Sequence, residues 1–284
     1  MISALNKQPD GTIELTISIP WKRVEESYQK ALNKIAQGVT VKGFRKGKAP
    51  LKMVEEKTDK STIYQEALKT LVPEAYLEAV REQKITPILN PQIKVVSLEE
   101  GKDWQIIATT CELPAIKLEG YESAIRKALA AEKIWVPGKD EEKATPEQEN
   151  KKLEKIFKTL LGTIAVTLPT ILIEEEVNRM LSRLIDQTSK LGLTIEQYLS
   201  SIGKTNEQLR QEYQKQAEET LKLELILSAI ADEEKIIIPD AAVDKMIEAT
   251  PDEAMRKSLQ TPTQRAYIRQ LLRKKKMIDN LMKL

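Results

Sequence analysis

Positive charge, an aromatic ring and shape-restricting residues come together in one short segment, Gly43-Phe44-Arg45-Lys46-Gly47-Lys48-Ala49-Pro50. Lysine and arginine bind phosphates and carboxylates, and arginine can do so through two parallel hydrogen bonds. The stretch 27–54 around it contains several more cations and no Asp or Glu. Because the whole chain has a net charge of only +2, this segment predicts a docking surface for a polyanion or an acidic protein face.

Two other interpretations of the segment are weaker. A phosphate-binding P-loop needs G-x-x-x-x-G-K-[ST] between a strand and a helix, but here the glycines are one residue too close and Ala49 replaces the hydroxyl. A plain solvated turn is the commonest role for a lysine-rich loop. Against it, Phe44 is one of only two phenylalanines in the chain, and two glycines and Pro50 restrict the loop's shape.

Composition excludes several classes of chemistry. The 284 residues include no histidine and a single cysteine, Cys111, so we expect neither a zinc site nor an internal disulfide. The absence of histidine removes the side chain most used for proton transfer near neutral pH, so we expect no catalytic residues, although composition alone leaves catalysis by carboxylates or lysine open. We also expect no cofactor, since aromatic residues make up only 4% of the chain and no nucleotide motif is visible. No apolar run approaches the ~20 residues that span a bilayer, and no secretory signal is visible, which indicates a cytoplasmic protein without a membrane partner.

The first 114 residues predict an α+β domain. Residues 12–19 alternate between apolar and polar types, which indicates a half-buried strand, and an amphipathic helix follows from Pro20 to about Gly38. Helical patterns resume at Leu51 and again over 61–84. Residues 93–98 and 104–113 then predict two strands around a polar turn.

The remainder predicts an all-α region. The range 115–150 is rich in charge and is expected to be a helical or charged linker. The range 151–284 is expected to be mostly helical, with short extended apolar stretches before Pro169 and Pro239. Three Thr-x-x-Gln sequences have the spacing of a capping box and so mark helix starts at Thr145, Thr194 and Thr205. We therefore predict an α+β domain at 1–114, a linker, and an all-α, arm-bearing domain at 151–284.

The glycine- and lysine-rich segment resembles the Gly-Phe-Arg-Lys-Gly-Lys-x-Pro signature of the trigger factor family, bacterial chaperones that dock at the ribosomal exit tunnel. Further stretches in both halves of the chain are similar to that family in the same order along the sequence: Pro73-Glu74-Ala75-Tyr76, Asn90-Pro91-Gln92-Ile93, Glu112-Leu113-Pro114, Leu193–Leu199, Gly203–Arg210 and Lys222–Leu227.

The resemblance implies an ATP-independent chaperone that docks on the large ribosomal subunit near the tunnel exit. Its partners would be a ribosomal protein, ribosomal RNA and nascent or unfolded polypeptides, and the free protein would be able to form a homodimer. The ribosome-binding residues implied by the motif are Gly43, Phe44, Arg45, Lys46, Gly47, Lys48 and Pro50. The methionines of the helical region are candidate client contacts, with ordinary core packing as the alternative for each: Met180, Met246, Met255, Met277 and Met282.

One departure from the family pattern is large. Most members carry an FKBP-like prolyl isomerase domain of roughly 100 residues, the size of an ordinary small domain, between the two regions. Only 115–150 is available here, so we expect no isomerase activity. The alternatives are a prolyl isomerase of the same family, a basic RNA-binding protein, and a periplasmic chaperone, which would need an export signal.

Overall fold

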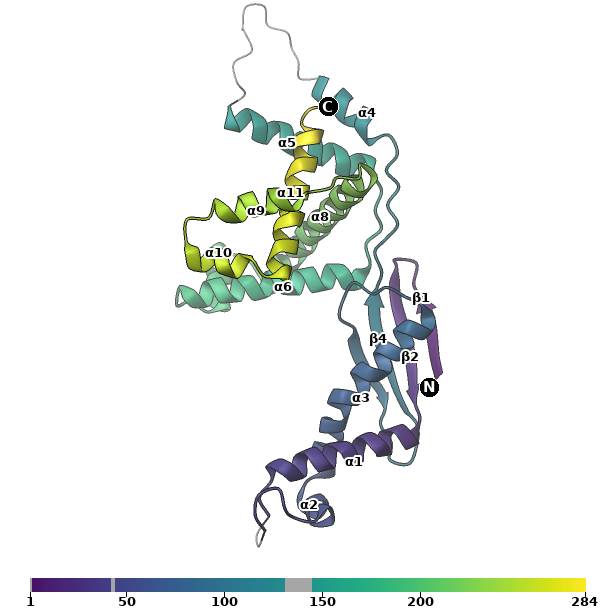
Figure 1. Cartoon of the computed structure of the whole chain (residues 1–284). Coiled ribbons are helices and arrows are strands. Elements are labelled where there is room, and N and C mark those ends of the chain that lie inside the picture. Colours follow the sequence, from purple (N-terminus) through teal and green to yellow (C-terminus); the bar gives the residue numbers. More distant parts are fainter. Residues whose placement is uncertain (1, 42–43, 131–144) are drawn as a thin grey trace, which may run out of the picture. The chain divides into compact units, whose positions relative to one another are not determined.

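The computed structural model describes residues 2–41, 44–130 and 145–284, which form two compact units (Figure 1). The first unit comprises Met1–Leu113 together with Pro169–Leu172. The second comprises Pro114–Leu168 and Ile173–Leu284. The predicted fold class, an α+β region followed by an all-helical region, is confirmed.

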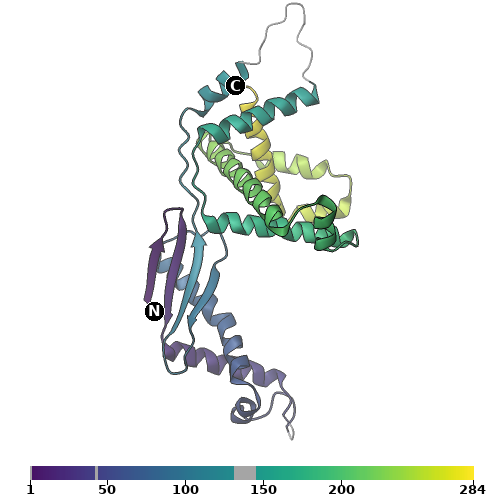
Figure 2. The same cartoon turned by 180° about the vertical axis from the view of Figure 1, so that it is seen from behind.

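The first unit is built on a four-stranded antiparallel sheet with the strand order β1-β2-β4-β3. Helix α3 crosses one face of the sheet (Figure 1), and among the described residues no helix of this unit covers the opposite face (Figure 2). The elements are β1 (Ile2–Lys7), β2 (Thr12–Ile19), α1 (Trp21–Gly38), α2 (Leu51–Lys57), α3 (Lys60–Gln83), β3 (Gln92–Ser97) and β4 (Trp104–Cys111).

The alternation predicted for β2 fixes which face of the sheet is buried. Its apolar residues are at most 1% exposed, and the register places Leu15 opposite Ala108 and Ile17 opposite Ile106 of β4. These side chains pack against α3 to form the main core of the unit. Strand β1 was not predicted, because its six residues, Ile2–Lys7, mix small and polar types too closely to give a clear alternation.

Every regular element among the described residues of the second unit is a helix. Its elements are α4 (Tyr121–Ala130), α5 (Pro146–Thr163), α6 (Thr170–Lys190), α7 (Ile195–Ile202), α8 (Asn206–Glu233), α9 (Asp240–Glu248), α10 (Glu253–Leu259) and α11 (Pro262–Leu281); the first residues of α6 group with the sheet unit. The predicted capping boxes at Thr145, Thr194 and Thr205 are confirmed, each with both reciprocal hydrogen bonds.

Arginines spaced by four residues pin α11 against its neighbours. Arg265 binds Asp244 of α9 at 2.6 Å, and Arg273 binds Asp232 of α8 at 2.5 Å. Arg269 lies between them and pairs with Asp240. These cations are therefore engaged within the unit and are not free for a partner.

Every helix among the described residues is too short or too polar to cross a lipid bilayer.

The predicted linker, 115–150, contains residues 131–144, which lie outside the described residues. The described part of that range includes α4 and the start of α5. The three-part division of the chain at 114 and 150 remains a prediction.

Candidate functional site

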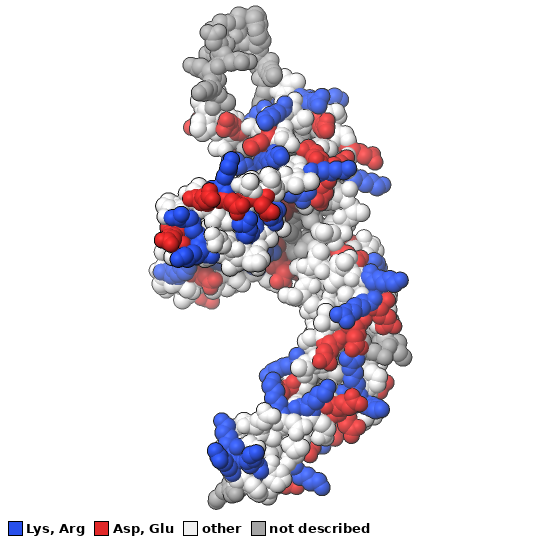
Figure 3. Space-filling view, viewed as in Figure 1, with Lys and Arg blue, Asp and Glu red and all other residues white. Residues whose placement is uncertain are grey.

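The candidate docking loop, residues 44–50, lies in the segment between α1 and α2 and carries predicted site residues at its surface; it is called the docking loop below. Phe44 is 39% exposed, an unusual position for one of the two phenylalanines, and Arg45, Lys46 and Lys48 are exposed. Gly43 and its neighbour Lys42 lie outside the described residues. Figure 3 shows Lys and Arg side chains gathered at the end of this unit where α1, the loop and α2 meet.

Two buried valines anchor the loop at its ends. Val41 is 2% exposed and Val54 is fully buried, and both pack in one cluster with Leu32 of α1 and Ile63 of α3. Burial of a valine side chain contributes roughly 1.5–3 kcal/mol. The loop therefore leaves and re-enters a packed core, and the charged residues project between two fixed points.

Backbone geometry explains the glycine at position 47. The Lys48 amide donates to the Arg45 carbonyl at 2.9 Å and closes a tight turn. Gly47 has a φ of +77°, and a Cβ at this position would lie 3.3 Å from the carbonyl oxygen of Gln37, at the end of α1. Any other residue would meet both the left-handed backbone penalty and this close approach, so the turn strongly favours glycine.

A hydrogen bond also ties α1 to α2. The Tyr28 hydroxyl donates to the Glu55 carboxylate at 3.0 Å. Burial and this hydrogen bond both raise the pKa of Tyr28, so the phenol stays protonated and keeps donating near neutral pH. The bond restrains the two helices from which the loop emerges.

One cation of the basic stretch is already engaged. Lys34 of α1 binds Glu66 of α3 at 2.6 Å, and Lys69 binds the same carboxylate at 2.8 Å. Hydrogen bonds from these two lysines lower the pKa of Glu66 to about 2. By contrast, within the described part of the chain no ion pair engages Arg45, Lys46 or Lys48, so their charges remain open to a partner.

The sequence interpretation missed two exposed side chains beside the loop. Leu51 is 38% exposed and Met53 is 41% exposed, both on the short helix α2, where only Val54 is buried. A seven-residue helix with one buried position leaves its other apolar residues at the surface. The signal in the sequence was the shortness of this helix, because a helix of seven residues buries few side chains and leaves its remaining apolar residues exposed.

The helical unit carries a second kind of candidate surface, made of exposed apolar side chains. Leu191, between α6 and α7, is 76% exposed, and Leu193 in the same connection and Ile185 near the end of α6 are also exposed. Of the candidate methionines, Met246 and Met255 are each 54% exposed, on α9 and α10. Met277 is buried in the packing of the unit, whereas Met180 and Met282 are partly buried.

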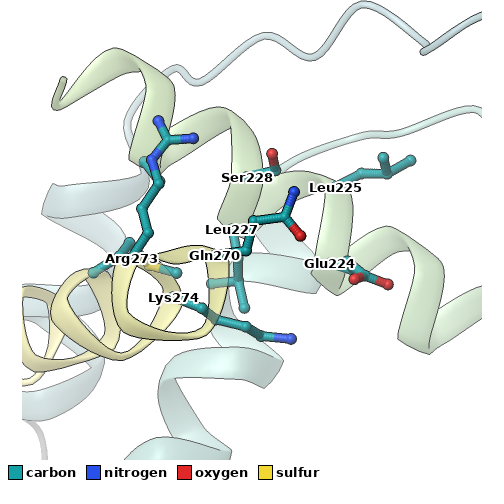
Figure 4. A pocket seen from close by; sticks show the side chains of 9 residues that line it. Glu224, Leu225, Leu227, Ser228, Gln270, Arg273 and Lys274 are labelled. Atoms are coloured by element: carbon teal, nitrogen blue, oxygen red, sulfur yellow. The ribbon is translucent and has the colours of Figure 1, made fainter. Parts of the chain in front are cut away.

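A groove of about 320 Å³ lies between α8 and α11 (Figure 4). Leu227, Ala231 and Met277 line it as buried apolar residues, and polar side chains, among them Gln270 and Lys274, surround it. Its volume is at the lower end of the range of ligand pockets, about 300–1,000 Å³. The groove is therefore a small hollow with a buried apolar base and a polar rim.

Comparison with protein families places both halves of the chain in one group. The family model "Bacterial trigger factor protein (TF)" matches residues 1–156, and the model "Bacterial trigger factor protein (TF) C-terminus" matches residues 138–283. Together the two models cover nearly the whole chain.

Among curated proteins, the chain is similar to trigger factors of several bacteria. It is 34% identical over 142 residues to that of Staphylococcus epidermidis, 35% over 142 residues to that of Staphylococcus carnosus, and 32% over 158 residues to that of Lactiplantibacillus plantarum. These matches cover 50%, 50% and 56% of this chain. They cover 32%, 31% and 35% of the relatives, so the chain spans about a third of the length of the curated relatives it matches.

A solved structure of a trigger factor chaperone, described for promiscuous substrate recognition in folding and assembly, has the same fold. The two chains superpose with a TM-score of 0.67 at 12% identity, over 100% of this chain and 99% of the other. At this identity the likeness concerns the fold alone.

Proposed function

Because the chain belongs to the trigger factor family, we propose that it is an ATP-independent chaperone that docks on the large ribosomal subunit and holds nascent or unfolded chains. The docking loop would provide the attachment, and the exposed apolar surfaces of the helical unit would contact clients. The protein would work in the cytoplasm, where ribosomes and nascent chains are found.

One observation carries the docking proposal: the loop is anchored at both ends yet exposes its cations and its aromatic ring. A rigid loop loses little conformational entropy on binding, so its contacts contribute more to affinity. Arg45 can form paired hydrogen bonds with a carboxylate or a phosphate, and Phe44 can fill a small apolar pocket. This combination fits the boundary between a ribosomal protein and ribosomal RNA.

Holding a client needs only weak, adaptable contacts once the chaperone is tethered. Attachment near the tunnel exit raises the local concentration of nascent chain, so low intrinsic affinity suffices. Leucine and methionine side chains adapt to many partners because they are flexible. Release follows when the client folds and buries its own apolar residues.

The test is ribosome co-sedimentation of a variant that combines Phe44→Ala, Arg45→Ala and Lys46→Ala. We expect most of the pelleted protein to be lost. The matched control combines Lys274→Ala, Lys275→Ala and Lys276→Ala, which removes three exposed charges from α11 in the other unit. Undiminished pelleting of the loop variant, or equal loss in the control, would refute the assigned docking site.

We further propose that this chain has no prolyl isomerase activity, because the range 115–150 is too short for the FKBP-like domain. A proline-peptide isomerisation assay is expected to give no rate above the uncatalysed background. A rate that is abolished by an FKBP inhibitor would contradict this.

The basic loop alone favours a second candidate, a general RNA-binding protein. This function predicts that free RNA competes for the protein as well as whole ribosomes do. The exposed Phe44, Leu51 and Met53 favour the chaperone instead, because an RNA backbone offers no apolar pocket for leucine or methionine.

A further inference from the structure

Strand β3 is an edge of the sheet, and it is apolar at the surface. It pairs with β4 on one side, and in the described residues no strand pairs with its other side. Ile93 is 38% exposed, Val95 47% and Val96 51%. An edge strand directs the N–H and C=O groups of alternate residues away from the sheet, where they can pair with a further strand.

The register explains why these side chains are uncovered. Ile93 lies opposite Ala108 and Val95 opposite Ile106, and both β4 residues are fully buried. Ile93 and Val95 therefore belong to the core face of the sheet. Helix α3 packs over β1 and β2 on that face, so the core ends at β4 and leaves its last strand open.

We propose that β3 accepts an extended segment of an unfolded client chain as a fifth strand. This rests on the proposed holding function, since the occupant is a client. An added strand would pair with the open main-chain groups of β3, which bind any sequence. Its alternate side chains would cover Ile93 and Val95, so segments with apolar residues at every second position fit best.

The charge of Lys94 also favours a particular kind of client segment. Lys94 is exposed and points to the face opposite that of Ile93 and Val95. A client residue directly opposite Lys94 shares that face, so a carboxylate there is favoured. The preferred client segment therefore alternates apolar residues with polar or acidic ones.

The same lysine disfavours a second copy of this chain as the occupant. Two copies of β3 paired antiparallel about Lys94 would bring two ammonium groups directly opposite each other. Shifting the pairing so that Ile93 faces Lys94 would oppose an apolar side chain to a cation. A pairing about Ile93 would bring Pro91, which lacks an amide proton, to the end of the ladder.

The docking edge is short. The regular ladder with β4 covers residues 92–95, and the register then shifts between Val95 and Ser97, with Val96 as the extra residue. A bulge ends regular pairing and twists the strand. A client segment would pair with about four residues, which suits weak and reversible holding.

The experiment uses the full chain and a fluorescein-labelled peptide that alternates valine and serine around one glutamate. Amide hydrogen exchange is measured over Gln92–Ser97 with and without the peptide. We expect the exchange of the outward-facing β3 amides to slow on binding. N-methylation of one alternate set of peptide residues is expected to weaken binding at β3 by about tenfold or more, because the peptide amides that face β3 can no longer donate hydrogen bonds to it. Methylation of the other set is expected to leave it unchanged.

Variants of exposed residues provide the control. Val95→Lys is expected to abolish the protection of β3, whereas Leu77→Lys on α3, where the side chain is 52% exposed, is expected to retain it. The proposal is overturned if the peptide binds without protecting β3, if both methylated sets bind equally, or if protection depends on protein concentration alone. The first two outcomes leave the holding function standing. Failure of the full chain to suppress aggregation of any unfolded protein would overturn that function itself.

Discussion

The Tyr28 hydroxyl donates a 3.0 Å hydrogen bond to the Glu55 carboxylate and so joins the helices on either side of the docking loop. Tyr28→Phe removes this bond without changing a loop residue. We expect a loss of unfolding free energy of about 1.5–3 kcal/mol, the usual net contribution of one hydrogen bond to a charged group. Ribosome affinity should fall with it, because the loop's supports become less restrained.

Urea denaturation and co-sedimentation of the same variant measure the two effects. Tyr267→Phe is the control, since that side chain is 57% exposed on α11. If Tyr28→Phe lowers stability but leaves ribosome binding intact, the α1–α2 hydrogen bond has no part in shaping the loop.

Gly47→Ala tests whether the shape of the loop matters apart from its charge. Both Gly47 and Gly101 have positive φ, +77° and +80°, so alanine at either position costs about 1–2 kcal/mol in the left-handed region. Only at Gly47 would the new Cβ approach a backbone atom, the Gln37 carbonyl oxygen, while nothing lies within 4 Å at Gly101. We expect Gly47→Ala alone to impair co-sedimentation; equal binding by both variants would contradict this.

The hydrogen bonds of Asp10 lead us to expect that the stability of the sheet unit depends on pH. Its carboxylate accepts hydrogen bonds of 2.8–2.9 Å from the amide and hydroxyl groups of Thr12 and Thr170. Burial alone would raise the pKa of Asp10, but these four bonds outweigh it and lower the pKa from 3.8 to about 2. The ionised form is therefore favoured by folding.

A lowered folded-state pKa stabilises the protein above the unfolded-state pKa, and this contribution is lost as the pH falls. We expect on the order of 1–2 kcal/mol to disappear between about pH 4 and pH 2. Asp10→Asn should remove that part of the slope and lower stability at pH 7. Urea denaturation across this pH range measures it; an unchanged slope in the variant would exclude Asp10 as the source.

Docking on ribosomal RNA should weaken steeply with salt, because the loop cations displace the counterions that are condensed on the RNA phosphates. Lys48→Ala is expected to reduce the slope of log affinity against log salt by about 1 if that lysine contacts a phosphate. Lys34→Ala is the informative comparison, since Lys34 already binds Glu66. Equal changes in slope for both variants would show that the loop cations have no special role.

Much of the fold could be predicted from local patterns. The period-2 alternation of β2 and the capping boxes at Thr145, Thr194 and Thr205 are local signals, and the structure confirms them. The loop was also identifiable, since glycine, proline and clustered charge are visible in sequence. Strand β1 was missed because its burial depends on pairing with β2, which residues 2–7 do not reveal by themselves.

The remaining features depend on contacts that no local pattern encodes. The pairing of Lys34 with Glu66, which separates engaged from open cations, joins residues on different helices. The exposure of Ile93 and Val95 arises because α3 does not extend over β3, and their alternating pattern alone indicates an ordinary buried strand. Both the Lys34–Glu66 pair and the exposure of β3 therefore follow from how the helices pack in three dimensions.

The hydrogen bonds between Asp10 and Thr170 span 160 positions of the chain. During synthesis every strand of the sheet emerges long before Thr170 does. A newly made domain that stops at Leu113 can pair all four strands, yet its Asp10 retains only the two bonds from Thr12. The sheet is thus expected to acquire its full resistance to acid only after the start of α6 has been translated.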